Sequence, residues 1–174
     1  MRNRAALFSS AIVLSVVGVV AFAAPANAVD TPVSVAVTGG SLSIAATPTN
    51  IAIPGFVASP QAVGFSIVLG DVTVTDARGT AAGWAASVSA ADFTATGGLT
   101  IPLAGATYSA PAATTTGTVT VVPATSTTLG TATAINTATA TGANTATWSP
   151  TIAATAPVGT QVGEYSTIVV HSVL

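Results

Sequence analysis

The sequence predicts an all-β protein, a single antiparallel β-sandwich preceded by a cleaved signal peptide. Short runs in which apolar and polar residues alternate recur along the chain, and glycine, proline or asparagine separates them. No stretch has the apolar period of an amphipathic helix, and no internal repeat or coiled-coil pattern occurs. Short alternating strands with turn residues at such intervals are typical of a β-sandwich.

The first 28 residues have the three parts of a secretory signal peptide. Two arginines precede an apolar run over residues 5–24, and Ala26-Asn27-Ala28 is a cleavage triplet of the small-x-small type. A retained membrane anchor is the alternative, because the apolar run is nearly long enough to span a bilayer. Pro25 and the triplet behind it favour removal. We therefore expect a secreted domain of residues 29–174 that is not bound to the membrane.

Removal of the leader leaves one cation, Arg78, against five acidic residues, a formal net charge of −4. A single cation cannot neutralise a row of phosphates, which excludes nucleic acid and anionic lipid headgroups as partners. The chain has no cysteine, so its stability must come from an apolar core rather than from disulfides. The polar surface must be made of serine, threonine, asparagine and backbone. Such a surface suits a neutral, hydroxyl-rich ligand such as a glycan, and it equally suits a surface with no ligand.

The first strands are expected between residues 33 and 69. Valines alternate with small residues over 33–37, Gly39-Gly40 supplies a turn, and apolar residues alternate again over 42–44. This pattern predicts a local hairpin. Prolines confine residues 47–56 to an edge or a connection. Residues 63–69 then lead into the next strand.

One stretch in the middle of the chain brings acid, base, glycine and tryptophan together. Val72 and Val74 alternate with threonines, a turn sequence follows, and Trp84, Ala86 and Val88 share one face of a second alternating run. The pattern predicts two antiparallel strands joined by a loop of about seven residues. The face that carries these five residues is expected to point into the core.

Two later segments complete the predicted fold. Residues 124–147 are nearly all alanine and threonine, which permits either a strand with a hydroxyl face or a flexible connection. A helix is disfavoured there by the density of β-branched threonine. Residues 160–174 become apolar on both faces from Ile168 onward, which is typical of a central strand.

The middle stretch resembles the first half of the WxL domain of Gram-positive cell-surface proteins. The shared motif is Asp-x-Arg-Gly followed by Gly-Trp, here Asp76-Ala77-Arg78-Gly79 and Gly83-Trp84. The second half of the family pattern has its counterparts, in the same order, in Trp148-Ser149-Pro150, Ala156-Pro157-Val158-Gly159 and Gly163-Glu164-Tyr165-Ser166-Thr167. The resemblance covers most of the chain after residue 60. It departs at the two Trp-x-Leu triplets of the family, which read Trp84-Ala85-Ala86 and His171-Ser172-Val173 here.

The resemblance implies a secreted, non-catalytic domain of the cell wall or cell surface. Such a domain binds peptidoglycan or another wall glycan, or a cell-surface protein partner. The alternative, from a different class, is a structural or adhesive surface protein. It assembles through protein–protein contacts at its sheet edges and has no glycan ligand.

The candidates for ligand contact are Trp148, Trp84, Asp76, Arg78 and Tyr165. The register of Trp84 with its apolar neighbours favours a core role over stacking on a sugar. Trp148 follows a polar run and precedes a proline, which makes it the better candidate for exposure. Asp76 and Arg78 flank one turn residue, which favours a structural turn lock over ligand contact. Tyr165 follows a glycine-rich corner and is expected to brace it.

No catalytic residue, metal site or cofactor is expected. The chain has one histidine, no cysteine and no lysine, which leaves no metal site built on His and Cys ligands. A Ser-His-Asp triad would have to use His171, and no nucleophile-elbow motif is present. A glycosidase needs two carboxylates that flank a cleft. Asp71 and Asp76 fall on opposite faces of their predicted strand, which argues against such a pair.

Overall fold

The computed structural model describes residues 32–124 and 127–174. The chain divides into two compact units, Met1–Ala36 and Val37–Leu174. The described part of the first unit, residues 32–36, has no regular secondary structure. The predicted signal peptide and its cleavage point lie outside the described residues.

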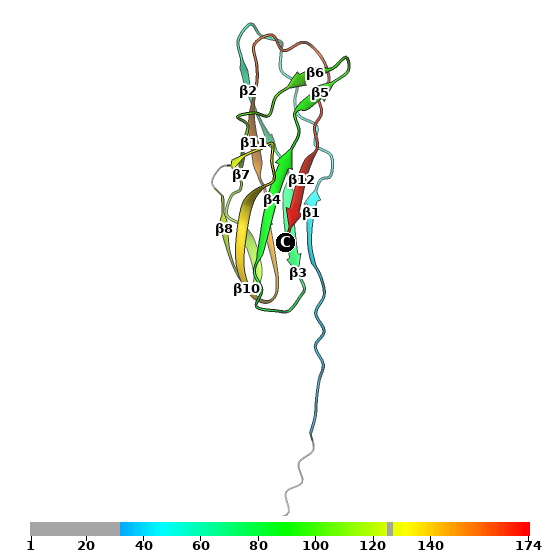
Figure 1. Ribbon diagram of the computed structural model, residues 1–174, viewed down its shortest axis with the longest axis vertical. Helices are drawn as coiled ribbons and strands as arrows, with labels where there is room; N and C mark the ends of the chain where they lie inside the picture. Colours follow the sequence, from blue (N-terminus) through cyan, green and yellow to red (C-terminus); the bar gives the residue numbers. More distant parts are fainter. Residues whose placement is uncertain (1–31, 125–126) are drawn as a thin grey trace, which may run out of the picture. The chain divides into compact units, whose positions relative to one another are not determined.

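The second unit is built of antiparallel β-strands, as the sequence predicts (Figure 1). The larger sheet has the order β1-β3-β10-β4-β12, and β8 pairs with β10 as well. Its strands are β1 (Leu42–Thr47), β3 (Asp71–Asp76), β10 (Thr133–Trp148), β4 (Trp84–Ala90), β12 (Val169–Val173) and β8 (Thr114–Pro123). The described residues contain no helix long and apolar enough to cross a membrane.

A smaller sheet and a two-stranded ribbon complete the fold. The smaller sheet has the order β2-β11-β7-β9, and the ribbon pairs β5 with β6. Their strands are β2 (Val63–Val68), β11 (Thr151–Ala156), β7 (Thr107–Ser109), β9 (Thr127–Thr128), β5 (Phe93–Ala95) and β6 (Leu99–Ile101). Apolar side chains from all three sheets form one buried cluster, which is the core of a β-sandwich.

The core contains the residues that the alternating patterns place there. Val72, Val74, Trp84, Ala86 and Val88 are all buried. Their neighbours along the two strands point the other way, because successive side chains of a strand alternate between its faces. The predicted inward face is therefore confirmed for both strands.

The alanine- and threonine-rich segment is the longest strand, β10, which settles the alternative that the sequence leaves open. Alanines on one face, among them Ala138 and Ala146, are buried, and threonines on the other face reach the surface. The long strand runs beside β8 along most of its length. On its other side it pairs with β4 through its first part and with β3 through its last part. β10 is thus the strand on which the larger sheet is built.

The predicted hairpin between β3 and β4 is wrong. The two strands are joined by residues 77–83, a loop of the expected length, but they do not pair with each other. Trp148 and Asn144 of β10 lie opposite Val72 and Asp76, whereas Ala138 lies opposite Trp84. Both strands are antiparallel to β10, so they run in the same direction. The loop advances the chain along β10 instead of reversing it.

The predicted hairpin over residues 33–44 is also wrong. Residues 32–40 form no strand, and β1 pairs with β3 instead. The predicted turn does not form because Gly39-Gly40 packs against the start of the 77–83 loop instead of reversing the chain. Gly40 N–H donates to the Ala77 carbonyl at 2.6 Å, and Ala77 N–H donates to the Ser41 carbonyl at 2.9 Å. The predicted central position of the last strand is wrong as well, because among the described strands β12 pairs only with β4 and lies at the end of the larger sheet.

Candidate functional site

Asp76 and Arg78 lock the 77–83 loop at its start. Arg78 Nε donates to Asp76 Oδ1 and Arg78 Nη2 donates to Asp76 Oδ2, both at 2.9 Å, a two-pronged ion pair. The backbone N–H of Arg78 donates to the same carboxylate at 3.0 Å. Nη2 also donates to the Gly83 carbonyl at 2.9 Å, at the far end of the loop. One guanidinium therefore joins both ends of the loop, which confirms the turn lock predicted for this pair.

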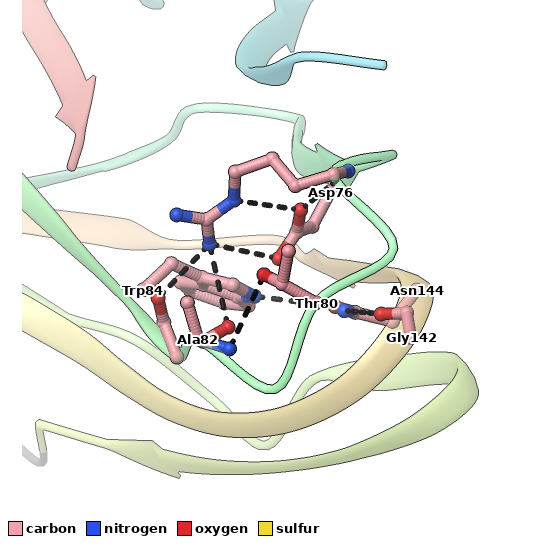
Figure 2. A network of polar contacts seen from close by, with 8 residues as sticks. Asp76, Thr80, Ala82, Trp84, Gly142 and Asn144 are labelled. Carbon is pink, nitrogen blue, oxygen red and sulfur yellow. Dashed lines mark hydrogen bonds and ion pairs between the residues drawn. The ribbon is translucent and has the colours of Figure 1, made fainter. Parts of the chain in front are cut away.

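The loop is tied to β10 by a second set of hydrogen bonds (Figure 2). Trp84 Nε1 donates to Asn144 Oδ1 at 3.2 Å, and Asn144 Nδ2 donates to the Gly142 carbonyl at 3.1 Å. Gly142 N–H donates in turn to the Thr80 carbonyl at 2.9 Å. The indole of Trp84 is thus both a core side chain, 4% exposed, and a hydrogen-bond donor to the strand behind it.

The two glycines of the loop are required for different structural reasons. Gly79 has φ +69°, in the left-handed region that glycine adopts without steric cost. Gly83 lies against β10, where an added Cβ would be 2.2 Å from the Ala138 carbonyl oxygen. A side chain at Gly83 would therefore separate the loop from β10. These two requirements account for both glycines of the sequence motif.

The ion pair sets the charge state of the buried carboxylate. Asp76 is 2% exposed, and burial alone would raise its pKa. The hydrogen bonds from Arg78 outweigh burial and lower the pKa of Asp76 from 3.8 to about 2. The same contact raises the pKa of Arg78. Asp71 lies on the opposite, exposed face of β3, as predicted, so the two carboxylates do not meet.

The second tryptophan is part of a buried chain of polar groups that joins the two main sheets. Trp148 Nε1 donates to the hydroxyl of Tyr108 at 3.2 Å, and that hydroxyl lies 3.1 Å from His171 Nε2. Trp148 and His171 belong to the larger sheet and Tyr108 to the smaller one. Because Tyr108 accepts from Trp148, its own proton is available to Nε2 of a neutral His171. Burial lowers the pKa of His171 and raises that of Tyr108 above its usual range.

The expected exposure of Trp148 is therefore wrong, because its side chain is only 2% exposed. It occupies an inward position of β10, in the register of the buried alanines. The partner that satisfies its indole N–H, Tyr108, lies forty residues earlier in the chain. A buried tryptophan needs such a partner, and the residues next to Trp148 in the sequence do not reveal it.

Tyr165 is the predicted site residue that borders a surface depression. Its hydroxyl donates to the Gln161 carbonyl at 2.9 Å, which confirms the predicted brace of its corner. The depression beside its half-buried ring has uncharged walls. They are formed by Gly98, Leu99, Thr100, Pro157, Val158, Gly159, Thr160, Gln161 and Tyr165. An aromatic ring, aliphatic side chains, hydroxyls and a carboxamide thus meet in one hollow.

The larger sheet presents a second uncharged surface, which we call the threonine face. Its members share the outward positions of β3, β8 and β10. They are Thr73, Thr75, Thr114, Thr116, Thr118, Thr120, Thr139, Thr141, Thr145 and Thr147. Cross-strand neighbours bond to each other: Thr116 and Thr145 hydroxyls lie 2.6 Å apart, and those of Thr73 and Thr147 lie 2.9 Å apart. These contacts order the hydroxyl groups across adjacent strands.

Two residues of these networks, Asn144 and Tyr108, are not among the candidates that the sequence motifs indicate. Asn144 falls in the alanine register of β10, and a carboxamide in a line of inward alanines is a signal that predicts a buried partner. Tyr108 lies between Thr107 and Ser109 in a short strand, and this alternation indicates that the tyrosine side chain points inward. The contacts of Tyr108 with Trp148 and His171 are not indicated by any local pattern, because they join strands that are distant in the sequence.

The remaining chemistry of the described residues is limited. No group of three or more His, Cys, Asp or Glu side chains in this part of the chain is placed to hold a metal ion. Asp92 accepts from the Leu103 backbone N–H at 2.7 Å, and Asp76 is held by Arg78. Both carboxylates therefore satisfy backbone and side-chain donors of the fold. The arrangement is suited to holding loops and presenting neutral surfaces.

The two triplets at which the sequence departs from the Trp-x-Leu pattern are neighbours in space. Val173 lies opposite Ala86, and Leu174 exchanges both backbone hydrogen bonds with Ala85. His171 lies opposite Val88. The first triplet, on β4, and the second, on β12, therefore lie on paired strands.

Comparison with known proteins gives one match. A family model described as WxL domain, surface cell wall-binding, matches residues 60–168. The match includes β2 through β11 and both tryptophans, together with the 77–83 loop and Tyr165. Searches of curated proteins and of solved structures returned no significant match.

Proposed function

Because the chain belongs to the family of WxL surface cell wall-binding domains, we propose that it is a secreted, non-catalytic domain that binds the glycan of peptidoglycan. The observation that carries this proposal is the depression beside Tyr165. A sugar ring has an apolar face and a rim of hydroxyl and amide groups. The depression offers an aromatic ring for the face, and Thr100, Thr160 and Gln161 for the rim.

The lack of charge on the domain supports a neutral ligand. Arg78 is the only cation after residue 28, and its guanidinium is engaged by Asp76 and by loop carbonyls. The threonine face adds ordered hydroxyls without charge. Surfaces of this kind exchange hydrogen bonds with glycan hydroxyls and acetamido groups. They attract neither phosphate nor carboxylate polymers over long distances.

The other candidate residues receive an indirect role in this proposal. Trp84 and Trp148 are buried, so neither ring is available to stack on a sugar. Asp76 and Arg78 hold the 77–83 loop, and Trp84 ties that loop to β10 through Asn144. We assign direct ligand contact to Tyr165, and we assign the positioning of the loop and strands to Trp84, Trp148, Asp76 and Arg78.

The test is sedimentation of the purified domain with peptidoglycan sacculi stripped of attached polymers and proteins. We expect the parent protein to sediment and Tyr165→Ala to bind about tenfold more weakly, the equivalent of about 1.4 kcal/mol. Tyr165→Phe is the matched control, since it keeps the ring and removes only the hydroxyl that bonds to the Gln161 carbonyl. It should still sediment.

Two results would count against the proposal at different levels. A parent protein that stays in the supernatant excludes peptidoglycan as the ligand. If Tyr165→Ala is folded and binds like the parent, the ligand lies elsewhere, and the threonine face is the next surface to test. Circular dichroism of each variant separates loss of binding from loss of fold.

A structural surface protein that assembles by protein–protein contacts remains the second candidate function. The observation in its favour is an open sheet edge, β8, whose sequence carries no charged residue. This edge has consequences of its own, which do not depend on glycan binding.

A further inference from the structure

The N-terminal segment Val33–Val37 has the pattern of a β-strand but no strand structure. Val33, Val35 and Val37 alternate with Ser34 and Ala36, so the valines would share one face of an extended chain. The structure gives residues 32–40 no regular secondary structure, and the three valines are 91%, 88% and 92% exposed. An apolar face of this kind is what pairing with a sheet would cover.

The β8 strand is the open edge that such a segment fits. Among the described residues it pairs with β10 alone, and its ten residues exceed the five or six of β1, β2 and β12. Exposed edges of this length usually carry lysine or an inward charge that blocks pairing. β8 has neither, since its sequence is TTTGTVTVVP. Its irregular position at Gly117 leaves 118–122 as a regular run of five residues.

The direction of the backbone groups in that run follows from one hydrogen bond. Ala124 N–H donates to the Ile135 carbonyl at 2.6 Å, and the two residues lie opposite each other in the register of β8 and β10. Bonded and unbonded pairs alternate along an antiparallel ladder. Val119 and Val121 are therefore unbonded positions, and their N–H and C=O groups point away from β10, toward the open edge.

The side chains of the two segments are complementary as well. Val119 and Val121 lie on the inner face of β8, half-buried against the core, while Thr118 and Thr120 lie on the exposed face. A strand placed along β8 with Val33, Val35 and Val37 on its inner face would cover the exposed side of these two valines. Its Ser34 and Ala36 would then extend the threonine face. Neither segment carries a charge that pairing would bury.

We propose that Val33–Val37 of one molecule adds as a strand to the free edge of β8 in a second molecule. Each molecule has one donor segment and one acceptor edge, so the contact is head to tail and generates open chains or rings. The inference goes beyond glycan binding and requires no wall material. It concerns protein–protein assembly alone.

The test measures the self-association of the chain from residue 29 onward by sedimentation velocity at increasing concentration. We expect the parent to associate and Val35→Lys to remain monomeric, because pairing would bury the lysine on the core side. Ser34→Lys is the matched control, with the same charge on the opposite face of the segment, and it should associate like the parent. Both changes lie outside all strands, so the fold measured by circular dichroism should not change.

A complementation experiment tests the head-to-tail geometry. Val121→Lys places an inward charge on the acceptor edge and leaves the donor segment intact. Each variant alone should be monomeric, and an equal mixture of Val35→Lys and Val121→Lys should form dimers but no longer chains. The proposal is overturned if the parent is monomeric at all concentrations, if Val35→Lys associates like the parent, if Ser34→Lys abolishes association, or if the folded mixture stays monomeric.

Discussion

Asp76 combines two properties that rarely coincide, deep burial and a full negative charge. Its carboxylate keeps that charge because Arg78 supplies three of its hydrogen bonds from two residues away. A charge that is buried and paired costs little, whereas a charge that loses its partner costs much more. The loop is consequently sensitive to protonation of this one group.

Acid should therefore weaken the domain through Asp76. The pKa of this group is about 2 in the folded protein, against 3.8 for the free side chain. Because the folded value is the lower one, the contribution to stability is complete above the unfolded value and is lost as the pH falls toward the folded value. We expect the melting temperature, measured from about pH 6 to about pH 2, to decrease once the pH is lower than about 4.

The variant Asp76→Asn should remove most of this acid dependence. At neutral pH it should already lose about 1–3 kcal/mol of the free energy of unfolding and melt at a lower temperature. Glu164→Gln changes an exposed carboxylate and is the control, with a melting profile like that of the parent. Equal acid sensitivity of Asp76→Asn and the parent would show that another group governs acid unfolding.

Tyr108 serves two partners with one hydroxyl, so the variant Tyr108→Phe should be costly. It keeps the ring in the core but leaves Trp148 Nε1 and His171 Nε2 without their shared partner. We expect a loss of about 1–3 kcal/mol in thermal or urea unfolding. The control is Ser172→Ala, which changes an exposed neighbour of His171 on β12 and should change stability little. An unchanged melting curve for Tyr108→Phe would mean that the buried polar chain adds nothing to stability.

The same chain of polar groups predicts a second pH effect, near neutrality. Burial lowers the pKa of His171, so the folded state favours the neutral ring. A lowered histidine pKa means that stability is complete above the unfolded value, about 6.5, and declines as the pH falls below it. This decline in stability should be absent from the variant His171→Gln. Melting temperatures of the parent and the variant between about pH 8 and about pH 5 test the prediction.

At the scale of elements, the 77–83 loop depends on its contact with β10. The variant Gly83→Ala would place a Cβ 2.2 Å from the Ala138 carbonyl oxygen, and one of the two segments would have to move. We expect a loss of about 1–3 kcal/mol, as for an overpacked contact in a core. Gly64→Ala, a strand glycine with open space around its Cβ position, is the matched control and should be tolerated. Melting curves of the two variants decide the matter.

The elements also show what a sequence pattern does and does not contain. The period of two in β3, β4 and β10 reveals which side chains point inward, and those directions are correct. The pairing partners are not contained in that period. Gly39-Gly40 and the 77–83 loop both have turn chemistry, yet neither closes a hairpin, because each docks on a distant segment. Local turn propensity was outweighed by tertiary contacts.

At the scale of the whole molecule, composition and periodicity are enough for the fold class, and motifs are enough for the family. The roles of the candidate residues are not contained in the local sequence, because the exposure of a side chain depends on the rest of the fold. The neighbouring Ser149 and Pro150 predict exposure of Trp148, whereas its burial depends on Tyr108 from the other sheet. The depression beside Tyr165 is formed by residues 98–100 and 157–165, two segments that no local pattern connects.

The position of β10 in the chain bears on how the domain folds. The larger sheet is assembled on a strand that begins at Thr133, and the partners of β3 in that strand lie 68 to 76 positions further along the chain. Contacts so distant in the sequence form late and slowly. A chain that is synthesised from its N-terminus cannot complete the larger sheet until β10 has been made. The larger sheet therefore closes only once most of the chain is present.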